Sequence, residues 1–156
     1  MKKLSLYFVV SVFIITLISC SSEPFPGFYG LKPGMTLKEF VSAAKKNGLY
    51  LYSGNKFSVN LCGERAFVSP IFEGSKIKAI DVWFPYKKEP EKARDFIFKL
   101  KDCLTKMYGN PITRTISHPN FTVVNYYWKY KDAYIYVGTR IKHFKTYPRI
   151  LIIRRK

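Results

Sequence analysis

The hydrophobic and polar positions of the chain form two helical segments, each followed by short segments that alternate in polarity. In the first helical segment the apolar positions are Leu37, Phe40, Val41 and Ala44. These residues recur at the three- and four-residue spacing of an amphipathic helix. Thr36 stands before them with Glu39 three places later, which is the pattern of a capping box. Asn47-Gly48 ends the predicted helix.

The second helical segment begins at Glu89-Pro90-Glu91. Its first turn contains acidic residues, which the helix dipole favours there. Its buried stripe is predicted to contain Phe96, Ile97, Leu100, Cys103, Leu104 and Met107. Tyr108-Gly109-Asn110-Pro111 ends it, because glycine and proline favour helix termination.

Aromatic and β-branched residues dominate the segments that follow each helix, and they predict antiparallel strands. Between the helices, Gly74-Ser75 separates two such segments and has glycine first, as a type II′ hairpin requires. After the second helix, strands are expected at about residues 112–117, 121–130, 133–141 and 147–154. Lys131-Asp132 is the expected tight connection between the middle two of these strands.

This order of elements predicts an α+β fold. We expect two helix-then-antiparallel-strands units, residues 30–85 and 86–156, which form one sheet with the helices on one face. Residues 30–156 would then be a single domain. The order of elements alone suggests a repeat, since the two halves share no sequence identity.

The amino terminus predicts an export signal. Lys2 and Lys3 precede an apolar run at residues 4–18, which is shorter than the roughly 20 residues of a membrane span. The run ends in Leu17-Ile18-Ser19-Cys20, which resembles the lipobox of bacterial lipoproteins. That resemblance implies a signal peptide at residues 1–19, lipidation of Cys20 by diacylglycerol, and a further acyl chain such as palmitate. An ordinary signal peptide with an incidental cysteine, or an anchor helix, is the alternative.

Residues 20–29 are predicted to be a tether, because their serine, proline and glycine content supports neither helix nor strand. Such a tether would keep the folded part close to the bilayer. Ser21 stands where enteric-type sorting places the aspartate that retains lipoproteins at the inner membrane. We therefore expect a bacterial cell-envelope protein, lipid-anchored at the outer membrane and facing the periplasm.

The charge balance favours anionic partners. The formal net charge is +17, or +15 once residues 1–19 with their two lysines are removed. Seven cations and no acid follow Asp132: Arg140, Lys142, Lys145, Arg149, Arg154, Arg155 and Lys156. These cations are candidates for contact with anionic lipid headgroups, and a solvated basic edge that discourages strand pairing is the alternative. Because export is expected, we expect no nucleic-acid partner.

Aromatic residues suggest a second surface. By two-residue periodicity Tyr126, Trp128 and Tyr130 share one side of their strand, and Tyr134 and Tyr136 share one side of the next. If these sides face away from the helices, they form a platform for a protein partner. Ordinary core packing or cross-strand pairing is the alternative.

Little in the sequence indicates catalysis. Apart from Cys20 the cysteines are Cys62 and Cys103, whose even number permits a disulfide in an oxidising compartment. Two buried free thiols are the alternative. His118 and His143 have no partner at metal-ligand spacing, and no nucleophile elbow, phosphate loop or zinc signature is present. We expect no metal, no cofactor and no enzymatic activity.

Gly34-Met35-Thr36 opens a capped helix, and over about residues 30–48 the chain resembles the SmpA/OmlA (BamE-like) lipoproteins. The glycine-x-proline that follows the helix in that family occurs here only after the second helix, at Gly109-Asn110-Pro111. The helix-then-strands order also resembles the fold of the β-lactamase inhibitor protein. The first resemblance implies an accessory, noncatalytic role. We therefore predict an envelope lipoprotein that binds a protein or envelope component; the alternative is an inhibitor or immunity lipoprotein that blocks a periplasmic enzyme.

Overall fold

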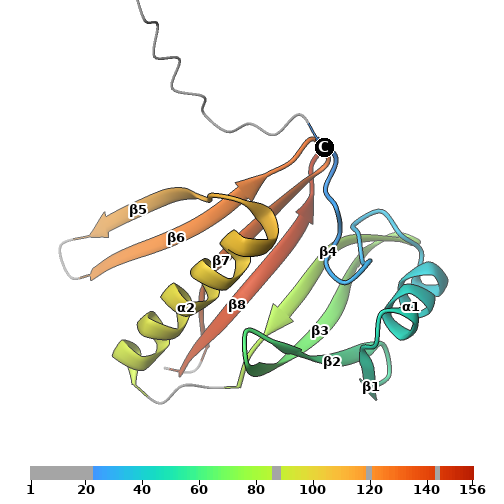
Figure 1. Ribbon diagram of the computed structural model, residues 1–156, viewed down its shortest axis with the longest axis horizontal. Coiled ribbons are helices and arrows are strands. Elements are labelled where there is room, and N and C mark those ends of the chain that lie inside the picture. The colour runs from blue at the N-terminus through green and yellow to red at the C-terminus, as the bar shows by residue number, and fades with distance from the viewer. Residues whose placement is uncertain (1–22, 86–88, 119–120, 143–144) are drawn as a thin grey trace, which may run out of the picture.

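The computed structural model describes residues 23–85, 89–118, 121–142 and 145–156, and these form one eight-stranded antiparallel sheet with two helices (Figure 1). The helices are α1 (Leu37–Lys46) and α2 (Pro90–Tyr108). The strands are β1 (Tyr50–Ser53), β2 (Lys56–Leu61), β3 (Glu64–Glu73), β4 (Lys76–Trp83), β5 (Ile112–His118), β6 (Phe121–Lys129), β7 (Ala133–Lys142) and β8 (Lys145–Arg154). The predicted signal peptide, residues 1–19, and Cys20 lie outside the described residues.

Helix α1 begins with the predicted capping box, which the structure confirms. The backbone N–H of Glu39 donates to Thr36 Oγ1 at 3.3 Å, and the backbone N–H of Thr36 donates to the Glu39 carboxylate at 2.7 Å. The bond from the Thr36 amide holds the pKa of Glu39 below its usual value. Phe40 and Ala44 then bury one side of the helix.

The strand order in the sheet is β1-β2-β3-β4-β8-β7-β6-β5. Within β1–β4 and within β5–β8, consecutive strands are neighbours in the sheet. The second set begins at the edge with β5 and ends in the middle of the sheet, where β8 pairs with β4. Helix α2 connects the two sets. It runs in nearly the same direction as β8 (Figure 1), and its 19 residues span about 28 Å at 1.5 Å per residue, so it carries the chain along the strands before β5 begins at the far edge.

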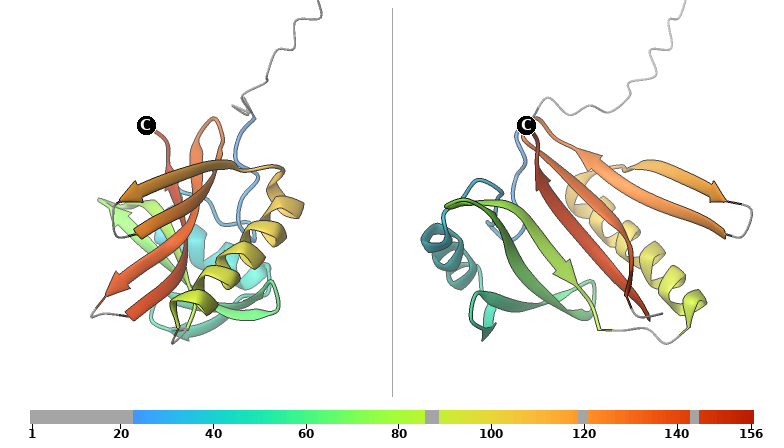
Figure 2. Two further views of the ribbon diagram at one scale, coloured as in Figure 1. Left: turned by 90° about the vertical axis from the view of Figure 1, so that its left-hand side faces the viewer. Right: turned by 180° about the vertical axis from the view of Figure 1, so that it is seen from behind.

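The predicted assembly into two like units with both helices on one face is therefore wrong. The described chain is mostly sheet, and only α1 precedes the strands, because α2 stands between β4 and β5. The helices lie apart over different parts of the sheet (Figure 2). Helix α1 contacts the edge strand β1, whereas α2 packs on β7 and β8. The two helices thus do not form a common layer or equivalent units.

One hydrophobic core joins the sheet to both helices. It includes Phe57, Val68, Ile80, Val82, Ile135 and Ile152 from the sheet and Phe40, Phe96, Leu100 and Leu104 from the helices. Phe25 and Phe28 belong to the same core and are 1% and 0% exposed. The described part of the expected tether is therefore packed. Its proline and glycine content excludes regular structure, but does not prevent the aromatic residues between them from being buried.

The amino-terminal segment reaches the core next to the connection between β6 and β7. The backbone N–H of Phe25 donates to Asp132 Oδ1 at 2.7 Å, and the N–H of Lys131 donates to the Glu23 carbonyl at 3.0 Å. The N–H of Arg155 donates to the Asp132 carbonyl at 2.8 Å. Glu23, the β6–β7 connection and the carboxyl terminus therefore meet at one corner of the molecule (Figure 1).

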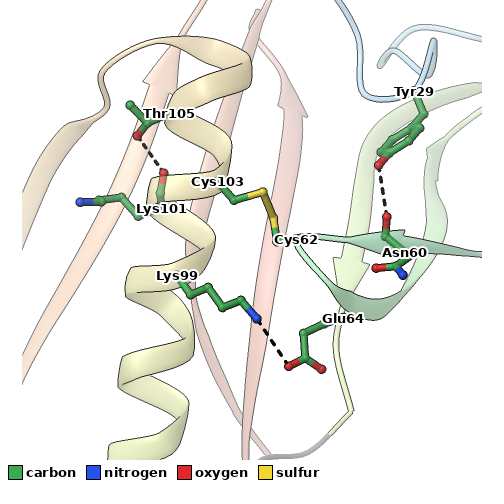
Figure 3. The surroundings of a disulfide bond; sticks show 8 residues. All are labelled: Tyr29, Asn60, Cys62, Glu64, Lys99, Lys101, Cys103 and Thr105. Carbon is green, nitrogen blue, oxygen red and sulfur yellow. Dashed lines mark hydrogen bonds and ion pairs between the residues drawn. A yellow bond between two sulfur atoms is a disulfide. The ribbon is translucent and has the colours of Figure 1, made fainter.

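A disulfide joins Cys62, in the turn between β2 and β3, to Cys103 in α2 (Figure 3). The two Cα atoms are 5.9 Å apart. Cys62 and Gly63 both have positive φ, at 56° and 78°, as a two-residue type I′ turn requires. Lys99 Nζ of α2 lies 4.0 Å from Glu64 Oε1 beside the bridge. Since α2 packs on β7 and β8, the bridge ties the first half of the sheet to the second.

Candidate binding site on the outer sheet face

The structure separates the five aromatic residues that were predicted to form one binding surface. Tyr126, Trp128 and Tyr130 face the core and are only 6%, 3% and 8% exposed. Tyr134 and Tyr136 lie on the opposite side of the sheet, with Tyr136 39% exposed. The prediction of a shared platform is therefore wrong for the first three residues. Core packing accounts for them.

The buried aromatic residues of β6 hold the carboxyl end of α2. Trp128 Nε1 donates to the Gly109 carbonyl at 2.6 Å, and the Tyr130 hydroxyl donates to the Tyr108 carbonyl at 3.2 Å. The Tyr108 hydroxyl donates in turn to the Gly27 carbonyl at 3.1 Å. Burial raises the pKa of Tyr108 well above its usual value, so this hydroxyl remains a donor. These tyrosines and the tryptophan thus have structural partners.

Strand register explains which aromatic residues share a face. The connection Lys131-Asp132 has two residues, and the N–H of Tyr130 donates to the Ala133 carbonyl at 2.9 Å. Even-numbered residues of β6 therefore pair with odd-numbered residues of β7, as Trp128 does with Ile135, and odd-numbered residues of β6 pair with even-numbered residues of β7, as Tyr127 does with Tyr136. The predicted two-residue connection implies this register, from which it follows that Tyr127 lies beside Tyr136.

We call the side of the sheet that carries Tyr127, Tyr134, Tyr136 and Leu151 the outer face, because the core and α2 lie on the other side. Its first half is filled by its own side chains. Phe67 stacks on Trp83 with ring centroids 4.4 Å apart, Tyr52 meets Phe67 edge-on, and the Arg65 guanidinium lies 5.2 Å from the Phe67 ring centroid. Phe67 is consequently only 8% exposed.

The second half of the outer face contains a concave site of about 480 Å³, which we call the outer-face pocket. Its charged and aromatic lining residues are Arg114, Lys129, Arg149, Tyr127, Tyr134 and Tyr136. Asn125 adds an amide. No acidic side chain lines the pocket among the described residues. The site is therefore both aromatic and cationic.

Three tyrosines form the aromatic part of the outer-face pocket. The rings of Tyr127 and Tyr136 are 5.8 Å apart with an interplanar angle of 27°, and those of Tyr134 and Tyr136 are 6.0 Å apart with an angle of 33°. Burial raises the pKa of Tyr136, as do Tyr134 and Tyr127, whereas Arg114 lowers it. The Tyr136 hydroxyl therefore stays protonated at neutral pH and can both donate and accept hydrogen bonds.

Arg149 is held at the pocket by an ion pair across the sheet. Its Nε donates to Asp81 Oδ1 at 2.5 Å, and the side chains of both residues are mostly buried, 24% and 16% exposed. A guanidinium has five N–H donors, and Nε is the one that bonds Asp81. The pair fixes the orientation of the guanidinium plane, which favours recognition of a carboxylate or phosphate.

Gly138 contributes to the depth of the pocket because it has no side chain. A Cβ atom at this position would lie 2.6 Å from Asn125 Oδ1 on the neighbouring strand. The Asn125 side chain thus lies over Gly138. Sequence reasoning missed both residues, since neither belongs to a motif and only the position of β6 beside β7 in the fold brings them together.

The structure does not bring the seven carboxyl-terminal cations together. The corner that contains Glu23 also contains the last three cations, Arg154, Arg155 and Lys156. The Arg155 guanidinium there lies 5.8 Å from the Tyr134 ring centroid. The backbone of Arg140, Lys142 and Lys145 is at the other end of the β7–β8 hairpin, about 30 Å away along ten-residue strands. Arg149 lies between these two groups, in the outer-face pocket.

Two further observations concern metal and membrane. Within the part of the chain that the structure describes, no group of three or more His, Cys, Asp or Glu residues comes together as a metal site. No helix of the described ranges has the length and apolar content needed to cross a membrane.

Comparison with known proteins adds no relative. No protein-family model matches the chain, and no curated protein or solved structure is significantly similar to it. The resemblances to the SmpA/OmlA lipoproteins and to the β-lactamase inhibitor protein therefore remain expectations from the sequence.

Proposed function

We propose that this protein is a noncatalytic, lipid-anchored binding protein of the bacterial cell envelope, whose binding surface is the outer-face pocket. The observation that carries the binding role is the concave group of three tyrosines and three cations with no acid among its described lining residues. Tyr and Arg residues are typical of binding surfaces. The proposal of a lipid anchor, at the outer membrane and facing the periplasm, rests on Leu17-Ile18-Ser19-Cys20.

The geometry of the amino-terminal corner is compatible with a membrane anchor. Cys20 precedes Glu23 by three residues, which span at most about 10 Å. A lipid on Cys20 would therefore bring the corner with Lys131, Arg154 and Lys156 close to the bilayer. All three side chains are exposed. Each cation would add about 1 kcal/mol of attraction to an anionic membrane surface.

The proposed function can be tested by cross-linked pull-down of the lipidated protein from intact envelopes. Tyr136→Ala removes the centre of the outer-face pocket, and Tyr50→Ala is the matched control, because Tyr50 is a 76% exposed tyrosine on β1 at the other end of the sheet. We expect a discrete partner with the wild type and with Tyr50→Ala, and its loss with Tyr136→Ala. Cys20→Ala should release the protein from the membrane fraction if the thiol carries the anchor.

A partner recovered equally well with Tyr136→Ala would place binding elsewhere and contradict the proposal. A stoichiometric complex with a single enzyme, accompanied by loss of that enzyme's activity, would instead support the inhibitor or immunity role.

A further inference from the structure

We infer that the outer-face pocket binds an anionic saccharide, a sugar that carries carboxylate or phosphate groups. The inference rests on the proposed function and names the ligand class of the same surface. It is carried by the charge of the pocket, by its position within the sheet, and by the kinds of polar side chain that line it.

Charge selects an anion. Arg114, Lys129 and Arg149 line the pocket, and Asp81 offsets only the charge of Arg149. The structure records no carboxylate partner for Arg114 or Lys129 among its described residues. A neutral ligand would remove water from these two cations without compensation, whereas a ligand with two negative charges would form charge-assisted hydrogen bonds with them.

The position of the pocket disfavours an extended acidic peptide. Peptides that add to a sheet bind along an edge strand, where backbone N–H and C=O groups are unpaired. The tyrosines of the pocket lie where β6, β7 and β8 are paired, with Tyr127 opposite Tyr136 and Tyr136 opposite Leu151. The pairing of β6 with β7 ends at Tyr126 and Val137, so Asn125 and Gly138 lie beyond it. Along the tyrosine-lined part the backbone groups are used by the ladder, so a ligand there is recognised by side chains. The amides of an extended peptide would be poorly satisfied.

A saccharide matches the side chains that are present. The grouped rings of Tyr127, Tyr134 and Tyr136 offer apolar surface against which a sugar ring can pack, and Tyr136 is the most exposed of them at 39%. The Asn125 amide and the tyrosine hydroxyls can both donate and accept hydrogen bonds, as sugar hydroxyls do. The volume of about 480 Å³ lies within the range of roughly 300–1,000 Å³ typical of small-ligand sites, which suits a short oligosaccharide.

The test is isothermal titration calorimetry of the purified, mature lipidated protein in non-ionic detergent. Trigalacturonic acid and fructose bisphosphate serve as anionic saccharides. Maltotriose is the neutral sugar of matched size, and triglutamate is an acidic peptide with similar charge. We expect at least one anionic saccharide to bind at least tenfold more tightly than maltotriose or triglutamate, with an affinity that falls as salt is raised.

Variants locate the binding. Arg114→Ala and Tyr136→Ala should each weaken the preferred saccharide about tenfold, which corresponds to about 1.4 kcal/mol. Arg94→Ala is the matched control, since Arg94 is an exposed arginine of α2 on the other side of the sheet, and it should leave the affinity unchanged. Circular dichroism and thermal unfolding establish that each variant is folded.

Three results would overturn the inference: no binding of either anionic saccharide, equal or tighter binding of triglutamate, or full affinity in both Arg114→Ala and Tyr136→Ala. The proposed function is judged separately. A protein partner from envelopes that is lost with Tyr136→Ala, together with no saccharide binding, would end only the saccharide inference.

Discussion

Removal of the disulfide gives the prediction whose magnitude follows most directly from the structure. The bridge joins residues 41 apart in sequence and links the β2–β3 turn to α2. In the chain-entropy model, a closed loop of this length lowers the entropy of the unfolded chain enough to stabilise the folded state by about 4 kcal/mol. Helix α2 would still be held by Phe96, Leu100 and Leu104 in the core. We therefore expect the Cys62→Ala, Cys103→Ala double variant to fold, but with this loss of stability.

The assay is equilibrium unfolding in guanidinium chloride, followed by tryptophan fluorescence and circular dichroism. For a chain of this size a loss of about 4 kcal/mol corresponds to a midpoint shift of about 1 M. Reduction of the wild type should lower its midpoint to that of the variant, and the variant should not respond to reducing agent. A loss below about 1 kcal/mol, or an equal response of the variant to reductant, would refute the reasoning.

Three further predictions concern single residues. Trp128→Ala should lower the free energy of unfolding by about 3–5 kcal/mol, because Trp128 is 3% exposed, whereas Tyr136→Ala should cost about 1 kcal/mol; thermal unfolding compares them. Burial raises the pKa of Tyr108, so the folded protein keeps a proton that the unfolded chain loses above about pH 10. Stability should therefore be unaffected by this group below that pH and fall above it, and denaturation series at alkaline pH should show a smaller fall in Tyr108→Phe. Gly138→Ala should displace Asn125 into the outer-face pocket and weaken saccharide binding in calorimetry while the thermal midpoint changes little; unchanged affinity would contradict this account of the pocket.

The secondary-structure elements could be predicted from local signals. Thr36 and Glu39 form the expected capping box, Gly74 stands in the expected hairpin turn, and α2 lies between Pro90 and Tyr108 as its acidic start and glycine end indicated. These features depend on neighbouring residues only. Each is therefore visible in a short stretch of sequence.

The assembly of the elements could not be predicted in the same way. The pairing of β4 with β8 joins Val82 to Ile150, and no local pattern indicates that α2 carries the chain to the far edge of the sheet. Burial of Phe25 likewise depends on Asp132, which is 107 residues away. Such long-range contacts decide which strand lies in the middle and which segment packs against it.

The candidate site could be predicted only in part from local signals. Alternation along β6 separates Tyr127 from Trp128, but both sides of this strand carry aromatic residues, so alternation alone does not tell which side is buried. The two-residue connection Lys131-Asp132 supplies the missing register and pairs Tyr127 with Tyr136. The contribution of Arg114 could not be found in this way, because it depends on the position of β5 at the edge of the sheet.

The central claim is that the outer-face pocket is the surface by which this protein binds a component of the envelope. It is tested most directly by photo-cross-linking in intact cells, with a photoreactive amino acid in place of Tyr136 or, in a separate strain, of Tyr50. Both side chains are exposed, but only Tyr136 lines the pocket. The account predicts a discrete cross-linked product from position 136 and none from position 50. A product from position 50 alone, or none from position 136, would contradict it.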